Sequence, residues 1–221
     1  MKICILIPVY NEARTIGEIV RCLRESSYDV LVVDDGSKDD SAHLAQENGA
    51  VVVSHEGQKG KGASLRQGFE YILNKKYEGV IMMDGDGQHH IKDIMGFLEK
   101  AQEYPKIIVV GNRMKDTKRM PLLRYLTNRL MSVLISLASG QYIPDTQCGF
   151  RYISYEALKE LSLSSDGFEI ETEILMKARK KKIKICSVPI ETIYENEESK
   201  INPVVDTFRF IIYFIKELFS F

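Results

Sequence analysis

Two carboxylates stand two residues apart in the segment 84–88, Asp-Gly-Asp-Gly-Gln. Alternate side chains of an extended segment share a face, so Asp84 and Asp86 can point into one crevice. Hard oxygen ligands of this kind suit Mg²⁺ or Mn²⁺ bridging a diphosphate. A solvated turn is the alternative, and an isolated Asp-x-Asp favours it. A calcium loop is excluded, because Gln88 and His89 stand where an EF-hand requires Asp or Asn and then Gly.

A second acidic pair, Asp34 and Asp35, ends another apolar run. These carboxylates could accept hydrogen bonds from a nucleobase or a ribose. The alternative is the start of a helix with Ser37 or Asp39 as its N-cap. Each cluster alone is weak evidence, but two acidic clusters at successive strand ends together favour a nucleotide site.

A glycine- and lysine-rich loop spans residues 57–62 and lacks both common phosphate-binding patterns. Ala63 follows Gly62, so Gly-x-x-x-x-Gly-Lys-Ser/Thr is not met, and Gly-x-Gly-x-x-Gly is absent too. An ordinary helix start and a loop that touches a bound nucleotide fit this pattern equally well.

The adjacent His89 and His90 do not indicate zinc, because neighbouring side chains diverge and no third ligand is evident. At least one of them is expected on the surface.

Alternating strands and helices must position these groups. Apolar runs predict strands at 2–9, 28–33, 50–53, 79–83 and 106–110. Helical spacing predicts helices at 16–23, 39–48, 65–73 and 91–98. This alternation is typical of an α/β fold, with a mostly parallel central sheet flanked by helices. Ligands bind beyond the carboxyl ends of such strands, so the four acidic residues are expected to converge there.

The second half of the chain is less regular. Its predicted elements are a leucine-rich helix at 121–139, a strand near 149–153, helices at 155–161 and 169–182, and extended structure at 183–194 interrupted by Pro189. A chain of 221 residues, 44% of them hydrophobic, is long enough for the core of one domain.

The net charge and the cysteine content limit which classes of partner and which cellular compartment are expected for this protein. A net charge of −1 creates no global field that would attract nucleic acid, so no nucleic-acid partner is expected. The four cysteines form no CxxC pair, and the first residues lack the regions of a signal peptide. Reduced thiols and a cytoplasmic location are therefore expected.

Several short motifs, taken in order, resemble those of family 2 glycosyltransferases, and most closely the dolichyl- or polyprenyl-phosphate sugar synthases. They lie at 7–12, 33–37, 60–62, 84–89, 111–113, 145–151 and 199–200, and so cover nearly the whole chain. The resemblance implies a GT-A fold, with a Rossmann-like nucleotide-binding half and a helical, membrane-facing acceptor side. It also implies a nucleotide-sugar donor of the GDP-mannose or UDP-glucose type, Mg²⁺ or Mn²⁺, and inversion at the anomeric carbon.

The resemblance further implies roles for individual residues. The donor site would contain Pro8, Tyr10, Glu12, Asp34, Asp35, Lys61, Asp84, Gly85, Asp86, Gln88, Arg113 and Lys200. Asp84 and Asp86, with Gln88, would hold the metal, and Asp86, Asp145 and Arg113 would be catalytic. The acceptor phosphate would meet Arg124, Arg129, Arg151 and Ser199.

The acceptor decides whether a base is needed. A lipid monophosphate is already anionic near neutral pH, since its second pKa is about 6, and needs none. A saccharide or protein hydroxyl would need a carboxylate to remove its proton, and Asp145 is the candidate. A turn after Pro144 explains Asp145 equally well. A nucleotide-sugar binding module without catalysis is a further alternative, against which the intact acidic pair and Arg113 argue.

One motif departs from the pattern. Polyprenyl-phosphate mannose synthases carry Arg-x-x-Gly-x-Ser-Lys before the last helix, whereas this chain has Tyr194 and Glu197 at the Arg and Gly positions. Ser199 and Lys200 alone match. The departure puts the identity of the sugar, and that of the acceptor, in doubt.

The C-terminal residues are strongly apolar. We expect a transferase domain over 1–202 and a helix over 203–221 that packs on the domain or lies at the membrane interface. The apolar run 210–215 is too short to span a bilayer, which needs about 20 residues. The expected partners are the nucleotide-sugar donor, a lipid-phosphate acceptor, and a membrane surface or an integral membrane partner. The protein would then be peripheral on the cytoplasmic face.

Overall fold

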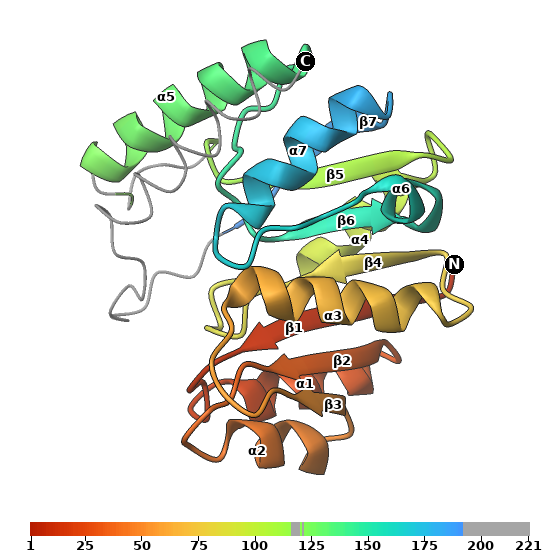
Figure 1. Cartoon of the computed structure of the whole chain (residues 1–221), viewed down its shortest axis with the longest axis vertical. Coiled ribbons are helices and arrows are strands. Elements are labelled where there is room, and N and C mark those ends of the chain that lie inside the picture. The colour runs from red at the N-terminus through yellow and green to blue at the C-terminus, as the bar shows by residue number, and fades with distance from the viewer. Residues whose placement is uncertain (116–119, 121, 192–221) are drawn as a thin grey trace.

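A seven-stranded mixed sheet forms the centre of the protein (Figure 1). The computed structural model describes residues 1–115, 120 and 122–191. The strands are β1 (Ile3–Val9), β2 (Asp29–Asp34), β3 (Val51–Ser54), β4 (Gly79–Met82), β5 (Ile107–Asn112), β6 (Arg151–Ser154) and β7 (Lys184–Pro189). Their order across the sheet is β3-β2-β1-β4-β6-β5-β7.

Most neighbouring strands run parallel. Of the seven described strands, β6 alone runs against its neighbours, β4 and β5, while every other pair is parallel. Central strands are apolar because helices cover both faces of the sheet: the residues of β4, for example, are all buried. The predicted mostly parallel α/β sheet is confirmed.

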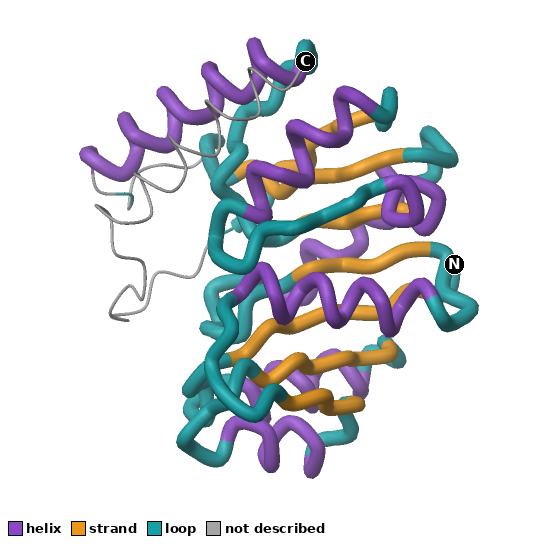
Figure 2. Tube along the Cα trace, viewed as in Figure 1, coloured by secondary structure: helices purple, strands orange, loops and turns teal. Residues whose placement is uncertain are grey.

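Helices lie on both sides of this sheet (Figures 1 and 2). They are α1 (Ile16–Glu25), α2 (Ser41–Glu47), α3 (Lys61–Leu73), α4 (Ile94–Ala101) with a short 3-10 turn η1 (Ile91–Asp93) before it, α5 (Leu122–Ser139), α6 (Tyr155–Glu160) and α7 (Ile170–Lys180). In Figure 1, α3, α6 and α7 lie in front of the sheet, and α1 and α4 lie behind it. Each buries its apolar side; Ile16, Val20 and Leu23 of α1 are fully enclosed.

Several element boundaries differ from the prediction, and two of them lie next to the site. The third helix begins at Lys61 rather than near Leu65, because its first turn is made of small and polar residues that show no apolar spacing. The second helix begins at Ser41, with Asp40 preceding it, so neither Ser37 nor Asp39 is its N-cap. Asp39 nevertheless accepts a hydrogen bond from the backbone N–H of Ser41 (3.1 Å).

The leucine-rich helix α5 stands apart from the sheet and packs mainly on α7 (Figure 1). Its outer side is apolar and open to solvent: Leu122, Leu126, Leu130, Val133 and Leu137 are 51–74% exposed. We call these five residues the α5 stripe. No helix in the described part of the chain has the length and hydropathy of a membrane span. The predicted helix at 203–221, and the domain boundary before it, lie outside the described residues.

Candidate active site

The loops after β1, β2, β3 and β4 meet at the carboxyl edge of the sheet. The backbone N–H of Asp35 donates to the carbonyl of Val9 (2.8 Å), which joins the first two loops. The hydroxyl of Thr15 donates to the carbonyl of Gly85 (2.6 Å), which ties the acidic loop after β4 to the start of α1. The acidic residues predicted at separate strand ends therefore share one edge of the sheet.

Asp35 is buried and shapes the loop after β3. Its Oδ1 accepts the N–H of Lys59 and its Oδ2 accepts the N–H of Gly60, both at 2.8 Å. The Nδ1 of His55, also buried, lies 2.8 Å from Oδ1. Asp34 has a more local role, because its Oδ1 accepts the N–H of Ser37 (3.1 Å) within the turn. Asp35 thus sets the course of residues 59–60 toward the site.

The segment Gly60-Lys61-Gly62 starts α3 against a second loop, 165–167. Gly60 has φ of +106°, and a Cβ there would lie 2.4 Å from the carbonyl oxygen of Asp166. A Cβ on Gly62 would lie 2.4 Å from the carbonyl oxygen of Ser165. The N–H of Gly62 donates to the Asp166 carbonyl (2.7 Å), as does that of Ala63 (3.2 Å). These two amides are used inside the protein and form a helix start, while contact of this segment with the donor stays a prediction.

The side chain of Lys61 points back to the acidic loop. Its Nζ lies 2.6 Å from Asp84 Oδ1 and 2.6 Å from Glu171 Oε1, and Glu171 belongs to the first turn of α7. Burial alone would lower the pKa of Lys61, but the charges of Asp84 and Glu171 outweigh it and raise that pKa. Burial opposes ionisation of Asp84 as well, yet Lys61 and His89 hold the pKa of Asp84 well below its ordinary value. Gly60 and Lys61 therefore link Asp35 to Asp84.

Asp86 has a different environment from Asp84. Its Oδ1 accepts the backbone N–H of Gln88 (3.0 Å), and both burial and the nearby charge of Asp84 raise its pKa. A partly buried carboxylate beside another carboxylate is a position that a cation would stabilise. Gly149 lies against Asp84, since a Cβ there would meet Asp84 Oδ2 at 2.6 Å.

The acidic pair fits a divalent cation that also holds substrate phosphates. Within residues 1–115, 120 and 122–191, no group of three or more His, Cys, Asp or Glu side chains could form a complete metal site. Mg²⁺ in nucleotide sites is commonly held by one or two carboxylates together with the phosphates of the substrate. Asp84 and Asp86 supply the two carboxylates, so the residues present fit such an ion. The role of Gln88 at the metal stays a prediction.

Asp145 is enclosed and bound to Arg113. Arg113 donates from Nε to Oδ2 (2.7 Å) and from Nη2 to Oδ1 (3.0 Å), and its backbone N–H reaches Oδ2 (3.2 Å). Gln147 N–H donates to Oδ1 (3.2 Å), and Asp145 is only 1% exposed. With both oxygens engaged and no access from solvent, this geometry argues against a base role for Asp145 and for a role in positioning Arg113.

Arg151 is also enclosed, which corrects the expectation that it meets an acceptor phosphate. The residue is 0% exposed. Its guanidinium donates to the backbone carbonyls of Cys148 (2.7 Å), Thr146 (2.8 Å) and Glu171 (2.6 Å). Because its guanidinium donates to these three carbonyls, Arg151 joins the 146–148 loop to α7. Its side chain is not accessible to a ligand in this structure.

The other predicted residues lie around this centre or beyond the described chain. Pro8 pairs with Val33 in the sheet, and Tyr10 and Glu12 follow on the next loop, all half-buried. Glu12 passes close to Gly85, whose added Cβ would lie 3.5 Å from Glu12 Cγ.

Two of the four predicted acceptor residues lie on α5. Arg124 is half-buried there, and Arg129 is exposed on the same side as the α5 stripe. Ser199 and Lys200 lie outside the described residues.

Three residues of the site were missed by sequence reasoning. Glu171 binds Lys61 across 110 positions, and nothing in its own segment marks it. His55 contacts Asp35 from the end of β3. His89 is buried, stacks on Phe150 with ring centroids 4.8 Å apart, and places Nε2 3.4 Å from Asp84 Oδ2. The signal in the sequence that could have identified His89 was its position next to the acidic segment 84–88. His90 is the more exposed of the two histidines.

Known proteins resemble this chain over most of its length. An uncharacterized protein of Methanocaldococcus jannaschii is 33% identical over 98% of this chain and 92% of its own. A UDP-N-acetylglucosamine–dolichyl-phosphate N-acetylglucosaminyltransferase of Methanococcus voltae is 34% identical over 87% of this chain and 86% of its own.

Solved structures show the same architecture. Glucosyl-3-phosphoglycerate synthase of Mycobacterium tuberculosis, in complex with UDP, matches 98% of this chain and 80% of its own with a TM-score of 0.79 at 19% identity. A second structure of that synthase, with a TM-score of 0.73, contains Mn²⁺, UDP and glucosyl-3-phosphoglycerate. The likeness shows that the fold is GT-A.

Residues 4–162 match the family model described as Glycosyl transferase family 2. That match covers more than half of the chain and includes the loops after β1 to β4 that build the site. The chain is a glycosyltransferase and belongs to glycosyl transferase family 2.

Proposed function

We propose that this enzyme transfers a sugar from a uridine diphosphate sugar to a polyprenyl or dolichyl phosphate, with a divalent cation at Asp84 and Asp86. The observation that carries the donor half is the joining of Asp35 and Asp84 through the consecutive residues Gly60 and Lys61. The uridine base is supported by the name of the Methanococcus relative. The Mn²⁺ and UDP bound by the mycobacterial synthase of the same fold agree with it.

On the donor side, carboxylates and loops have separate tasks. Asp84 and Asp86 would hold the cation, which supplies stabilisation of the negative charge that develops on the leaving diphosphate. Tyr10, Glu12 and Asp35 line the loops where the nucleoside would lie, with Asp35 acting through the loop at 59–60.

On the acceptor side, the closed Arg113–Asp145 pair favours a phosphate over a hydroxyl. A hydroxyl acceptor needs a free carboxylate to remove its proton, and both oxygens of Asp145 are taken by Arg113. A phosphate oxygen is already negative at neutral pH. It would form a bond to the anomeric carbon while the bond from that carbon to the diphosphate oxygen breaks, with inversion, and no proton needs to move.

A lipid-borne acceptor also agrees with the α5 stripe. Monomeric soluble proteins rarely expose a contiguous apolar patch of this kind without a partner. Arg129 stands on the same side, where its guanidinium could meet a lipid phosphate while the leucines contact the bilayer interface. The enzyme would then be peripheral, with α5 and the predicted helix at 203–221 facing the membrane.

The test is transfer from a panel of UDP- and GDP-sugars to a polyprenyl phosphate and, in parallel, to the matching polyprenol. The two lipids differ only by the phosphate, so they separate a phosphate acceptor from a hydroxyl acceptor. We expect product with the phosphate and a UDP-sugar, and none with the alcohol. Equal transfer to the alcohol would overturn the phosphate assignment, and transfer from GDP-sugars alone would overturn the uridine assignment.

A further inference from the structure

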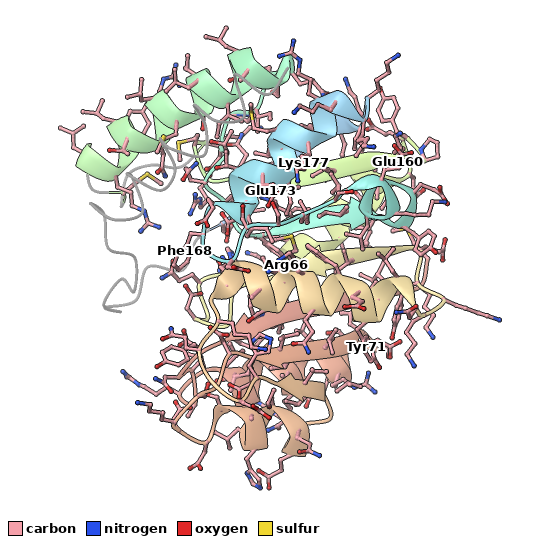
Figure 3. The ribbon with its side chains drawn as sticks, viewed as in Figure 1. Arg66, Tyr71, Glu160, Phe168, Glu173 and Lys177 are labelled. Carbon is pink, nitrogen blue, oxygen red and sulfur yellow. The ribbon has the colours of Figure 1, made fainter. Side chains whose placement is uncertain are left out.

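The ammonium of Lys61 is held between two carboxylates that belong to distant elements. Its Nζ lies 2.6 Å from Oδ1 of Asp84, after β4, and 2.6 Å from Oε1 of Glu171, on α7. The side chains of Lys61 and Glu171 are 15% and 12% exposed. The ring of Phe168, labelled in Figure 3, lies 5.6 Å from Nζ. The ammonium is therefore largely screened from water and has two carboxylates as partners.

This ammonium uses the carboxylate that a metal would need. Lys61 binds Oδ1 of Asp84, and His89 Nε2 lies 3.4 Å from Oδ2, so both oxygens of Asp84 face another group. A divalent cation bound to Asp84 would stand within a few ångströms of the ammonium. Two positive groups so close together repel each other strongly, because both would lie in surroundings less polar than water. Both cannot stay on Asp84 at full strength.

Glu171 is well placed to keep the ammonium when Asp84 releases it. It binds Lys61 already, and it is fixed from behind by Arg151, whose Nη2 lies 3.6 Å from Oε2 and whose Nη1 donates to the Glu171 carbonyl (2.6 Å). Lys61 itself is anchored at the first residue of α3. A short movement of the ammonium toward Glu171 would free Asp84 without moving the backbone.

We propose that Lys61 is a resident counter-ion that a divalent cation displaces from Asp84, and that Glu171 is the positioning residue that retains the displaced ammonium. This inference rests on the proposed cation site at Asp84 and Asp86. It adds a function for Lys61 and Glu171: Asp84 keeps a charge partner before the donor and its cation arrive, and the site needs no large rearrangement to accept them.

The first test measures Mn²⁺ binding without any nucleotide sugar, from the free Mn²⁺ signal in electron paramagnetic resonance. Lys61→Met should tighten Mn²⁺ binding about tenfold, because the competing ammonium is gone, and Glu171→Gln should weaken it about threefold. Lys177→Met is the matched control, since Lys177 pairs with the buried Glu173 (2.6 Å) farther along α7 (Figure 3). Glu169→Gln controls for the loss of one negative charge in this region. Both controls should bind Mn²⁺ within about twofold of wild type.

Unchanged or weaker Mn²⁺ binding by a folded Lys61→Met protein would overturn the proposed exchange of the Lys61 ammonium for a divalent cation on Asp84.

The second test follows the ammonium itself, by the acetylation rate of Lys61 measured by mass spectrometry with and without Mg²⁺. In wild type, Lys61 should stay slow in both conditions. In Glu171→Gln, Mg²⁺ should speed its labelling by about fivefold or more, because the displaced ammonium has no second carboxylate.

A labelling rate in Glu171→Gln that ignores Mg²⁺ would contradict the proposal even if Lys61→Met does not fold. If Asp84 and Asp86 do not bind a cation at all, the results would differ from those that reject the exchange alone. In that case wild type would bind no Mn²⁺ even with a UDP-sugar present, and Asp86→Ala would change nothing. Normal Mn²⁺ binding that Asp86→Ala abolishes, together with an unaffected Lys61→Met, would leave the cation site standing and reject only the exchange.

Discussion

Arg113 and Asp145 form a two-point ion pair inside the protein, with Nε 2.7 Å from Oδ2 and Nη2 3.0 Å from Oδ1. Arg113 follows β5 and Asp145 precedes β6, so the pair joins the segments next to these two strands. Because Asp145 is fully engaged, its chemistry is that of a counter-ion to Arg113. This engagement supports the proposed phosphate acceptor, which needs no base.

Asp145→Asn tests whether the aspartate is a counter-ion or a base. The change leaves the buried guanidinium of Arg113 without its charge partner, so we expect the free energy of unfolding to fall by roughly 3–5 kcal/mol. Urea unfolding measures it. The double variant Arg113→Met/Asp145→Leu should be less destabilised than Asp145→Asn, since no charge is left unpaired. A base predicts the opposite pattern, with normal stability and a loss confined to kcat.

The glycines before and inside the first turn of α3 give a second prediction. Gly60→Ala adds a Cβ at φ +106° and 2.4 Å from the Asp166 carbonyl oxygen, so it should destabilise the protein by roughly 1–3 kcal/mol and weaken donor binding. Gly57→Ala is the control, because a Cβ there meets no atom within 4 Å. Thermal unfolding and donor titration measure both effects. Equal behaviour of the two variants would show that the 60–62 segment does not depend on its contact with 165–167.

Glu173 should make stability depend on pH. It accepts hydrogen bonds from Ser164, Ser165 and Lys177, and so fixes the loop that caps α3. Burial alone would raise the pKa of Glu173, but Lys177 and Ser165 outweigh it and hold that pKa below its ordinary value. The depressed pKa means that the stabilisation is complete above about pH 5 and is lost as pH falls through the folded value.

Glu173→Gln should therefore unfold at a lower temperature than wild type at pH 7, by the equivalent of roughly 1–3 kcal/mol. The difference should shrink as the pH is lowered toward 3. Thermal unfolding of both proteins across that range measures it. A difference that is constant with pH would mean that the charge of Glu173 does not stabilise the loop.

The α5 stripe should bind lipid. Leu126→Gln/Leu130→Gln should reduce flotation with vesicles that contain anionic lipid by at least about threefold, because two exposed apolar side chains are lost from one helix face. Met95→Gln, on α4 behind the sheet, removes a side chain that is 56% exposed and should leave flotation unchanged. Activity on a short, water-soluble polyprenyl phosphate should survive in both. Equal flotation of wild type and both variants would show that the α5 stripe does not contact the membrane.

The sequence allowed much of the fold to be predicted, because apolar runs in a parallel sheet are continuous and their ends are marked by polar residues. It also placed Asp35 and Asp84 at one edge, since parallel strands end together. It could not reveal Glu171, which reaches Lys61 from α7 through tertiary packing alone. Nor could it show that Arg151 is enclosed, because an arginine in a short motif looks the same whether it binds a ligand or three backbone carbonyls.

The most direct test of the proposed cation site is the melting temperature of the protein with UDP-sugars in the presence and absence of Mn²⁺. Ligand that binds the folded state raises the melting temperature by mass action, by about 2.7 kcal/mol of stability at a hundredfold excess over Kd. We predict a rise that requires Mn²⁺ together with the UDP-sugar and that disappears in Asp86→Ala. A full rise without metal, or one that survives Asp86→Ala, would contradict the claim that the acidic pair after β4 holds the donor through a cation.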